Sequence, residues 1–317
     1  AYCSSAPLNQ NYRAKEYQFY LTDLNAKAVI LPKDIPSPAR EVAQELKIPI
    51  IELEINNNIE AGLFTLKTNR PTTSTTHEYV TEAEAEALVL HTSGTTARPK
   101  IVPLKQKNVI QSAKNIIHTL KLTSEDRCLN IMPLFHIHGL IGALLSSITA
   151  GASIVCTPAF DDNKFFNWIE TLEPTWYTSV PTLHQVIKEK KKKSSNILSG
   201  SHLRLIRSSS SPLPPQVMAE LESLFNVPVI ESYGMTEAAH QMSSNPLPPK
   251  IRKPGSVGLQ AGPEVAVMDE AGNFLNSGET GEIVIKGENV FCGYENKPEA
   301  NRESFVSGWF RTGDQGK

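Results

Sequence analysis

The chain has 317 residues, of which 40% are hydrophobic and 20% are charged, and its formal net charge is -2. This composition is typical of folded globular proteins, and the length allows two or three folding units of about 100–200 residues each. The small net charge excludes a global field that would attract nucleic acid or an anionic membrane. The apolar stretch 140–155 is interrupted by Ser146, Ser147 and Thr149, so it is too short and too polar to span a membrane.

The first part of the chain predicts helices that alternate with short apolar strands. We expect a helix at 15–24, a strand at 28–31, a helix at 39–47 and a strand at 49–53. The polar stretch 56–81, with its PTTSTT tract, is expected to be a surface loop or linker. Helices that alternate with buried strands indicate an α/β sheet whose strands run largely parallel.

Residues 91–104 spell HTSGTTARPKIVPL, which predicts two strands joined by a hydroxyl-rich loop. Small residues let backbone N–H groups approach an oxyanion, and the hydroxyls add further donors. One alternative is a Ser/Thr-rich surface hairpin, but the ending Arg98-Pro99-Lys100 places two cations beside the hydroxyls and favours a polyphosphate site. The Walker loop is excluded because Lys100 is followed by Ile101 instead of Ser or Thr.

The alternation continues from residue 107 to about residue 240. Expected helices cover 107–120, 140–148, 164–172, 182–190 and 216–225, and expected strands cover 128–132, 153–156, 176–180, 203–207 and 229–231. The segments PLFHIHGL, SSSSPLPP and SYGMTEAAH are expected to be turns or loops at the ends of strands. The lysine run 188–193 is interpreted as a solvated helix end and not as a site for acidic partners.

Beyond Gly255 the pattern changes to short strands with Gly turns, in EVAVMD, EAGNFL, GEIVIKG and VFCGY. This predicts a small barrel or sandwich. The expected division is residues 1–80, part of a first α/β subdomain; 81–254, the phosphate loop and a second α/β region; and 255–317, a β-rich subdomain. The loops 92–100, 133–139, 208–212 and 232–237 should converge on one crevice, because ligands bind outside the carboxyl ends of parallel strands.

Three motifs resemble those of the adenylate-forming superfamily, which includes acyl-CoA synthetases, luciferases and peptide-synthetase adenylation domains. They are HTSGTTARPKIVPL, ESYGMTEAAH at 231–240 and RTGD at 311–314; the first has Ala97 where the family usually has Gly. The resemblance implies the large N-terminal domain of these enzymes, truncated at both ends. This domain has two stacked α/β subdomains with largely parallel sheets and a small β-barrel-like subdomain. The family's mobile C-terminal domain would lie beyond residue 317, so we expect this chain alone to be poorly active.

The resemblance implies an ATP/AMP site that draws on all three motifs. Its residues would be Thr92, Ser93, Gly94, Thr95, Thr96, Lys100, Ser210, Ser211, Glu231, Ser232, Tyr233, Thr236 and Asp314. Tyr233 would stack on adenine, Thr236 would contact phosphate and Asp314 would bind the ribose hydroxyls. The catalytic residues implied are Lys100, Thr236, Glu237 and His136, with Glu237 as the Mg2+ ligand. Taken alone, ESYGMTEAAH could be an ordinary strand end, and RTGD could be a simple turn.

The resemblance implies a two-step reaction. A carboxylate attacks the α-phosphate of MgATP to give an acyl-adenylate and pyrophosphate, and CoA then displaces AMP. MPLFHIHGLIGALL, IRSSSSPL, MTEAAHQMSSNPLPP and KPGSVG are similar to the oxalyl-CoA synthetase branch. His136, Ser210 and His240 could then surround a second carboxylate, which favours a small dicarboxylate such as oxalate.

Three alternatives stay open: a medium-chain or aromatic acyl-CoA ligase, a luciferase-like or peptide-synthetase adenylation domain, and a non-catalytic nucleotide-binding protein. The cysteines Cys3, Cys128, Cys156 and Cys292 are far apart and form no CxxC pair, which indicates a reducing compartment without structural zinc. We expect an intracellular protein, peroxisomal or cytoplasmic. The sequence leaves the oligomeric state open.

Overall fold

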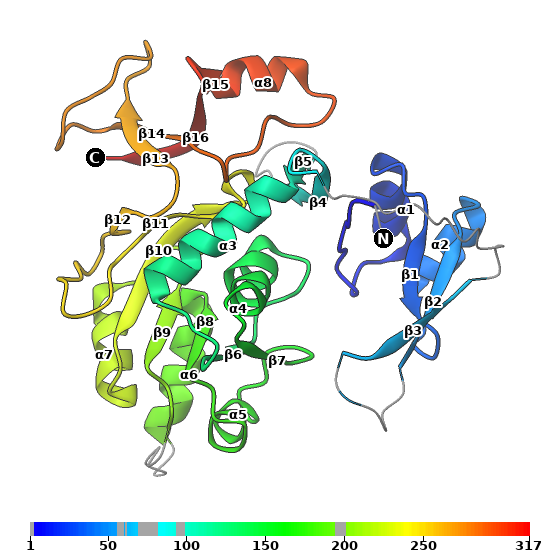
Figure 1. The fold of residues 1–317 in the computed structure, drawn as a ribbon, viewed down its shortest axis with the longest axis horizontal. Helices are drawn as coiled ribbons and strands as arrows, with labels where there is room; N and C mark the ends of the chain where they lie inside the picture. Colours follow the sequence, from blue (N-terminus) through cyan, green and yellow to red (C-terminus); the bar gives the residue numbers. More distant parts are fainter. Residues whose placement is uncertain (1–2, 56–59, 61, 69–81, 93–98, 194–200) are drawn as a thin grey trace. The chain divides into compact units, whose positions relative to one another are not determined.

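The computed structural model describes residues 3–55, 60, 62–68, 82–92, 99–193 and 201–317. These residues form two compact units, one from residues 6–81 and one from residues 82–317 together with 3–5 (Figure 1). The larger unit holds every expected site residue that the structure describes.

The smaller unit is a three-stranded sheet with two helices. Its strands β1 (Val29–Pro32) and β2 (Ile50–Ile55) are parallel, and β3 (Phe64–Lys67) pairs antiparallel with β2. The helices are α1 (Ala14–Asp23) and α2 (Pro38–Glu45). β3 lies in the stretch that was expected to be a loop. That expectation was wrong because the strand has only four residues, and its short apolar–polar alternation was outweighed by the polar sequence around it.

The larger unit is built on a seven-stranded sheet in the order β12-β11-β10-β9-β8-β6-β7. The central strands run parallel, as expected, and β11 and β12 add an antiparallel edge. The strands are β6 (Arg127–Asn130), β7 (Ser153–Cys156), β8 (Trp176–Ser179), β9 (Leu205–Ser208), β10 (Val229–Met235), β11 (His240–Ser244) and β12 (Leu259–Gln260).

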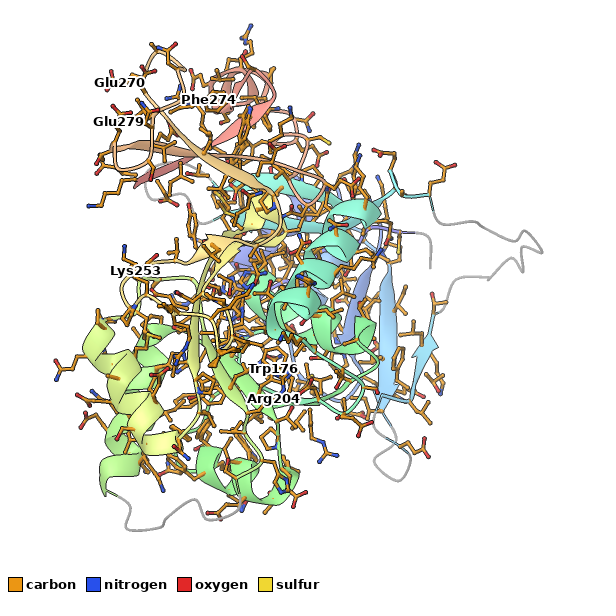
Figure 2. All side chains as sticks on the ribbon, turned by 60° about the vertical axis from the view of Figure 1, so that its left-hand side comes forward. Trp176, Arg204, Lys253, Glu270, Phe274 and Glu279 are labelled. Atoms are coloured by element: carbon orange, nitrogen blue, oxygen red, sulfur yellow. The ribbon has the colours of Figure 1, made fainter. Side chains whose placement is uncertain are left out.

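Alternate residues of the parallel strands enter two different cores. Trp176 and Leu205 pack with α3 (Gln106–Leu120) and the π-helix η1 (His138–Leu145), and Figure 2 shows Trp176 in the interior. Tyr177 and Ile206 pack with α5 (Phe165–Leu172), α6 (Pro181–Lys193) and α7 (Pro215–Phe225). Successive side chains of a strand point to opposite faces of the sheet, and helices pack against both faces.

Two further sheets complete the larger unit. The hairpin β4 (Glu86–Thr92) and β5 (Lys100–Lys105) is antiparallel, which confirms the two strands expected around the phosphate loop. A four-stranded antiparallel sheet in the order β13-β14-β16-β15 follows the parallel sheet in sequence. Its elements are β13 (Glu264–Met268), β14 (Gly281–Lys286), β15 (Phe305–Val306) and β16 (Trp309–Gly316), with α8 (Pro298–Ser304) before β15.

Other local predictions were also wrong. EAGNFL and VFCGY are not strands: the first is a turn with one β-bridge at Phe274, and the second is irregular. The end of PLFHIHGL is already helical, since η1 begins at His138 and is followed by α4 (Ser146–Thr149). RTGD, which taken alone could be a simple turn, lies within β16. Among the described residues, no helix combines the length and the apolarity that a membrane span requires.

Candidate functional site

The segment ESYGMTEAAH is a strand, a single 3-10 turn and the start of the next strand. The prediction of a loop at SYGMTEAAH was therefore wrong for its first four residues and for His240. β10 continues to Met235, η2 covers Thr236–Ala238, and β11 begins at His240. Gly234 is required at this hairpin, because a Cβ there would lie 1.7 Å from the carbonyl oxygen of His240. The tight turn fixes Tyr233, Thr236 and Glu237 on one short piece of backbone.

Tyr233 and Asp314 meet although they lie far apart in the sequence. The Tyr233 hydroxyl donates a short hydrogen bond to Asp314 on β16. Burial and this bond to the carboxylate raise the pKa of Tyr233, so the hydroxyl stays protonated. The structure therefore brings together the residues expected at the adenine ring and at the ribose.

Lys100, Tyr294 and Glu237 form a second group. The Tyr294 hydroxyl donates to Glu237 Oε1 at 2.8 Å, and Lys100 Nζ lies 4.4 Å from the centre of the Tyr294 ring. Burial raises the pKa of Glu237, while the bond from Tyr294 and the charge of Lys100 act in the opposite direction. Tyr294 thus links the expected catalytic lysine to the expected metal ligand.

The expected phosphate loop is only partly described. Thr92 ends β4 and pairs across the hairpin with Lys100, the first residue of β5. Ser93, Gly94, Thr95 and Thr96, together with Ala97, lie outside the described residues. The hairpin places both ends of the loop side by side, with Lys100 at the start of the returning strand.

The donor set around Glu237 fits Mg2+. Mg2+ in nucleotide sites takes one or two protein carboxylates and completes its shell with phosphates and water. Glu237 supplies one buried carboxylate beside a lysine, and among the described residues no group of three His, Cys, Asp or Glu could hold a metal by itself. Such a site would depend on the phosphates of the nucleotide.

The serine loop after β9 is anchored at several points. Ser209 Oγ donates to the carbonyl of Ser232 at 3.1 Å, and Glu231 Oε1 accepts from the N–H of Leu213 at 2.8 Å. Burial raises the pKa of Glu231, and Glu231 Oε2 has no hydrogen-bond partner among the described residues. Ser210 and Ser211 are exposed at the tip of the loop, and Ser210 has a φ of 72°, which is uncommon outside glycine.

Beside this loop lies a buried polar cluster that we call the Arg207 cluster: Thr178, Arg207, His138, His240 and Gln241, with Ser210 at its edge. Arg207 Nη1 donates to His240 Nε2 at 3.0 Å, and Nη2 donates to Gln241 Oε1 at 3.2 Å. His138 Nδ1 lies 3.0 Å from Ser210 Oγ. The imidazoles of His138 and His240 stack with centroids 4.9 Å apart.

The cluster carries one positive charge and no acid. Burial lowers the pKa of Arg207 to about 9, so Arg207 is still protonated at neutral pH. Burial, and then the nearby Arg207, lower the pKa values of His138 and His240 well below the usual range, so both rings are neutral. The described hydrogen bonds of Arg207 reach only Thr178, His240 and Gln241, and Nε has no partner.

His138, not His136, makes the contacts with Ser210 and His240. His136 is exposed and packs against the ring of Phe135, whereas the side chain of His138 is buried. His136 was expected from the resemblance, whereas His138, Thr178, Arg207 and Tyr294 were not. An arginine just before four serines, on a strand predicted to be buried, was the signal that could have found Arg207.

The chain is similar to known proteins over nearly its whole length. The chain is 42% identical to the oxalate–CoA ligase of Arabidopsis thaliana, covering 100% of this chain and 62% of that protein. It is 40% identical to the oxalate–CoA ligase of Saccharomyces cerevisiae, covering 98% of this chain and 61% of that protein. The chain thus spans about three fifths of the length of these relatives.

Among solved structures, the fold is similar to that of the o-succinylbenzoate coenzyme A synthetase of Bacillus subtilis in complex with ATP and magnesium ion. The TM-score is 0.78 at 27% identity, covering 98% of this chain and 60% of that one. The family model described as AMP-binding enzyme matches residues 2–295. The chain therefore belongs to the AMP-binding enzyme family.

Proposed function

We propose that the whole protein is an ATP-dependent acid–CoA ligase that acts on a small dicarboxylate such as oxalate. It would form an acyl-adenylate with release of pyrophosphate, and then an acyl-CoA with release of AMP. The names of the two relatives above support CoA as the acceptor and oxalate as the acid.

The observation that carries the substrate proposal is the positive charge of Arg207 without a carboxylate partner among the described residues. A buried charge without a counter-ion costs several kcal/mol, which an anion bound nearby would offset. A monocarboxylic acid uses its one carboxylate in the reaction, whereas a dicarboxylic acid keeps a second one. The Arg207 cluster, which ends at the exposed Ser210, is suited to that second carboxylate.

For the nucleotide we propose the roles that the resemblance implies. Tyr233 would stack on adenine, Asp314 would accept the ribose hydroxyls, and Thr236 would donate to a phosphate. Mg2+, when bound, would neutralise phosphate charge, held on the protein side by Glu237. Charge builds up on pyrophosphate as it leaves, and Lys100 is the cation placed to stabilise it.

In the proposed chemistry these residues position the substrates and stabilise charge. The substrate carboxylate is itself the nucleophile, so the protein needs no nucleophile of its own. We also propose a reducing compartment, peroxisomal or cytoplasmic, because the four cysteines form no CxxC pair in the sequence.

The test is pyrophosphate release by the full-length protein with MgATP and a panel of acids. The panel is oxalate, malonate, acetate, octanoate, benzoate and oxamate, which has the size of oxalate with one carboxylate replaced by an amide. We expect oxalate or malonate to give the highest kcat/KM and oxamate to be at least about tenfold poorer, because it lacks the second charge. AMP release with and without CoA then separates a CoA ligase from other adenylating enzymes.

Equal or better use of octanoate or benzoate would overturn the dicarboxylate proposal while leaving the ligase class intact. AMP release that does not depend on CoA would overturn the ligase proposal. Absence of pyrophosphate release with every acid would instead support a non-catalytic nucleotide-binding protein.

A further inference from the structure

In the Arg207 cluster, the groups that can only donate hydrogen bonds determine which ring nitrogens of the histidines carry a proton. A guanidinium has N–H donors and no acceptor, so His240 Nε2 must accept the bond from Arg207 Nη1. A neutral imidazole carries one proton, and in His240 that proton is therefore on Nδ1. No described residue accepts the Nδ1 proton, which leaves it available to a ligand.

Thr178 determines the proton position on His138 in a similar way. Thr178 and Arg207 are paired on the neighbouring strands β8 and β9, and Thr178 Oγ1 accepts from Arg207 Nη1 at 3.4 Å. Thr178 Oγ1 also lies 2.6 Å from His138 Nε2. If Thr178 accepted this second bond as well, its own proton would be buried without an acceptor among the described residues. Buried hydroxyl protons are rarely left unpaired, so Thr178 donates to His138 Nε2.

The direction of the next bond is then fixed. With Nε2 accepting, the proton of neutral His138 is on Nδ1, which donates to Ser210 Oγ at 3.0 Å. Ser210 is exposed, and no described residue accepts its own hydroxyl proton. The Ser210 hydroxyl is thus left as an outward donor.

We infer that Arg207 and Thr178 are positioning residues that set Ser210 and His240 as a pair of hydrogen-bond donors for the substrate acid. Arg207 acts on His240 directly, and on Ser210 through Thr178 and His138. A carboxylate only accepts hydrogen bonds, so two donors with fixed proton positions match it without reorientation. This inference rests on the proposed function, since it names how that site would select its acid.

The packing of η1 against the two imidazoles restricts their rotation. A Cβ added at Gly142 would lie 2.7 Å from His240 Nε2 and 3.1 Å from His138 Cδ2, so η1 presses on both rings. Gln241 is held in turn, because its Nε2 donates to Thr119 and to the carbonyl of Ala261, both at 3.0 Å. The donors are therefore held in place before any substrate arrives.

The test compares Thr178→Val and Thr178→Ser in the full-length protein. Valine keeps the shape and removes the hydroxyl, whereas serine keeps the hydroxyl and removes the methyl group. We expect Thr178→Val to raise the KM for oxalate about tenfold, with kcat within about twofold and the KM for MgATP unchanged. Thr178→Ser should stay within about threefold of the wild type. Thr157→Val is the matched control, because Thr157 donates only to the carbonyl of Asn130.

Wild-type KM for oxalate in Thr178→Val, or equal loss in both variants, would overturn the inference. Histidine 15N NMR tests the proton positions without turnover, and we expect both His138 and His240 to be protonated at Nδ1. A His138 proton on Nε2 would contradict the inference even if oxalate proves to be the substrate. Inactivity of the wild-type protein with every dicarboxylate would instead count against the proposed function.

Discussion

Tyr294 shows how a single side chain joins two parts of the candidate site. Its hydroxyl is bonded to Glu237 and its ring faces Lys100, while its backbone is clamped by Asn301, which accepts from the Tyr294 N–H at 2.7 Å and donates to its carbonyl at 2.9 Å. Burial and the neighbouring Glu237 raise the pKa of Tyr294, so the hydroxyl remains a donor. The position of Glu237 therefore depends on a residue that no sequence motif had marked.

Tyr294→Phe should lower the free energy of unfolding by about 1–2 kcal/mol, because it removes one hydrogen bond to a buried carboxylate and keeps the ring under Lys100. A double-mutant cycle with Glu237→Gln should give a coupling free energy of about 1 kcal/mol or more. Chemical denaturation of the four proteins measures both quantities. Additive effects would mean that the 2.8 Å contact contributes nothing to stability.

For single residues, the sequence predicted which residues belong to the candidate site better than it predicted which of them contact each other. Tyr233 and Asp314 were expected at one nucleotide site, and the structure joins them by a hydrogen bond. His138 was missed because two histidines in PLFHIHGL are equivalent until the start of η1 buries one of them. Thr178 and Arg207 were missed because strand register, which pairs them, is a long-range property that no local pattern contains.

Between elements, Asp126 joins α3 to the amino ends of the parallel strands. Arg204 donates to both carboxylate oxygens of Asp126, at 2.7 Å and 2.9 Å. It also donates to the carbonyl of Leu120, at the end of α3, at 3.0 Å. Thr175 donates to Asp126 Oδ1 at 2.6 Å. Arg204 and Trp176 lie near each other in Figure 2, at the end of the sheet that carries these contacts. Burial acts to raise the pKa of Asp126, but the bonds from Arg204 and Thr175 outweigh it and lower the pKa.

Asp126→Asn should therefore lower the free energy of unfolding at neutral pH by about 2–4 kcal/mol, because it leaves Arg204 without its counter-ion. An aspartate with a lowered folded-state pKa stabilises the protein above its unfolded pKa of about 3.9 and loses this effect as the pH falls through the folded value. The difference between variant and wild type should thus shrink in acid. Thermal unfolding between neutral and acidic pH measures it.

Glu299→Gln is the matched control, since the Glu299–Arg302 pair is exposed, with side-chain exposures of 74% and 77%. Its effect should stay within about 0.5 kcal/mol at every pH. A pH-independent loss in Asp126→Asn would show that packing, and not the ion pair, links α3 to the sheet.

For the whole molecule, the two compact units differ in how much apolar surface they bury. The smaller one has a core of Tyr17, Leu21, Leu31, Ala39 and Val42, and leaves Ile55, Phe64 and Leu66 exposed. The larger one is covered by helices on both faces of its parallel sheet. Small units bury a lower fraction of their surface and are correspondingly less stable.

Amides of β1 and β2 should exchange with solvent through openings of lower free energy than amides of β8 and β9. Hydrogen exchange followed by mass spectrometry on this chain measures both sets under the same conditions. Equal protection throughout would mean that the two units open as one cooperative body.

The order of helices and parallel strands was predictable at this scale because each element carries its own hydrophobic period. The antiparallel edge strands β11 and β12 were not, since they lie in polar and proline-rich sequence whose pairing is set by β10. Phe274, on the turn between Glu270 and Glu279 (Figure 2), shows the same limit: an apolar residue in an expected strand is 57% exposed on a turn.

The alternation of the parallel strands has a consequence for how the chain finds its fold. Leu205 and Arg207 lie on one face of β9, while Ile206 lies on the other, among α5, α6 and α7. A slip of one residue between β8 and β9 would place the Arg207 guanidinium in that largely apolar layer and Ile206 against the histidines. An unpaired charge in such a layer would cost several kcal/mol. The cation proposed to select the substrate would thus also disfavour a shifted register between β8 and β9 during folding.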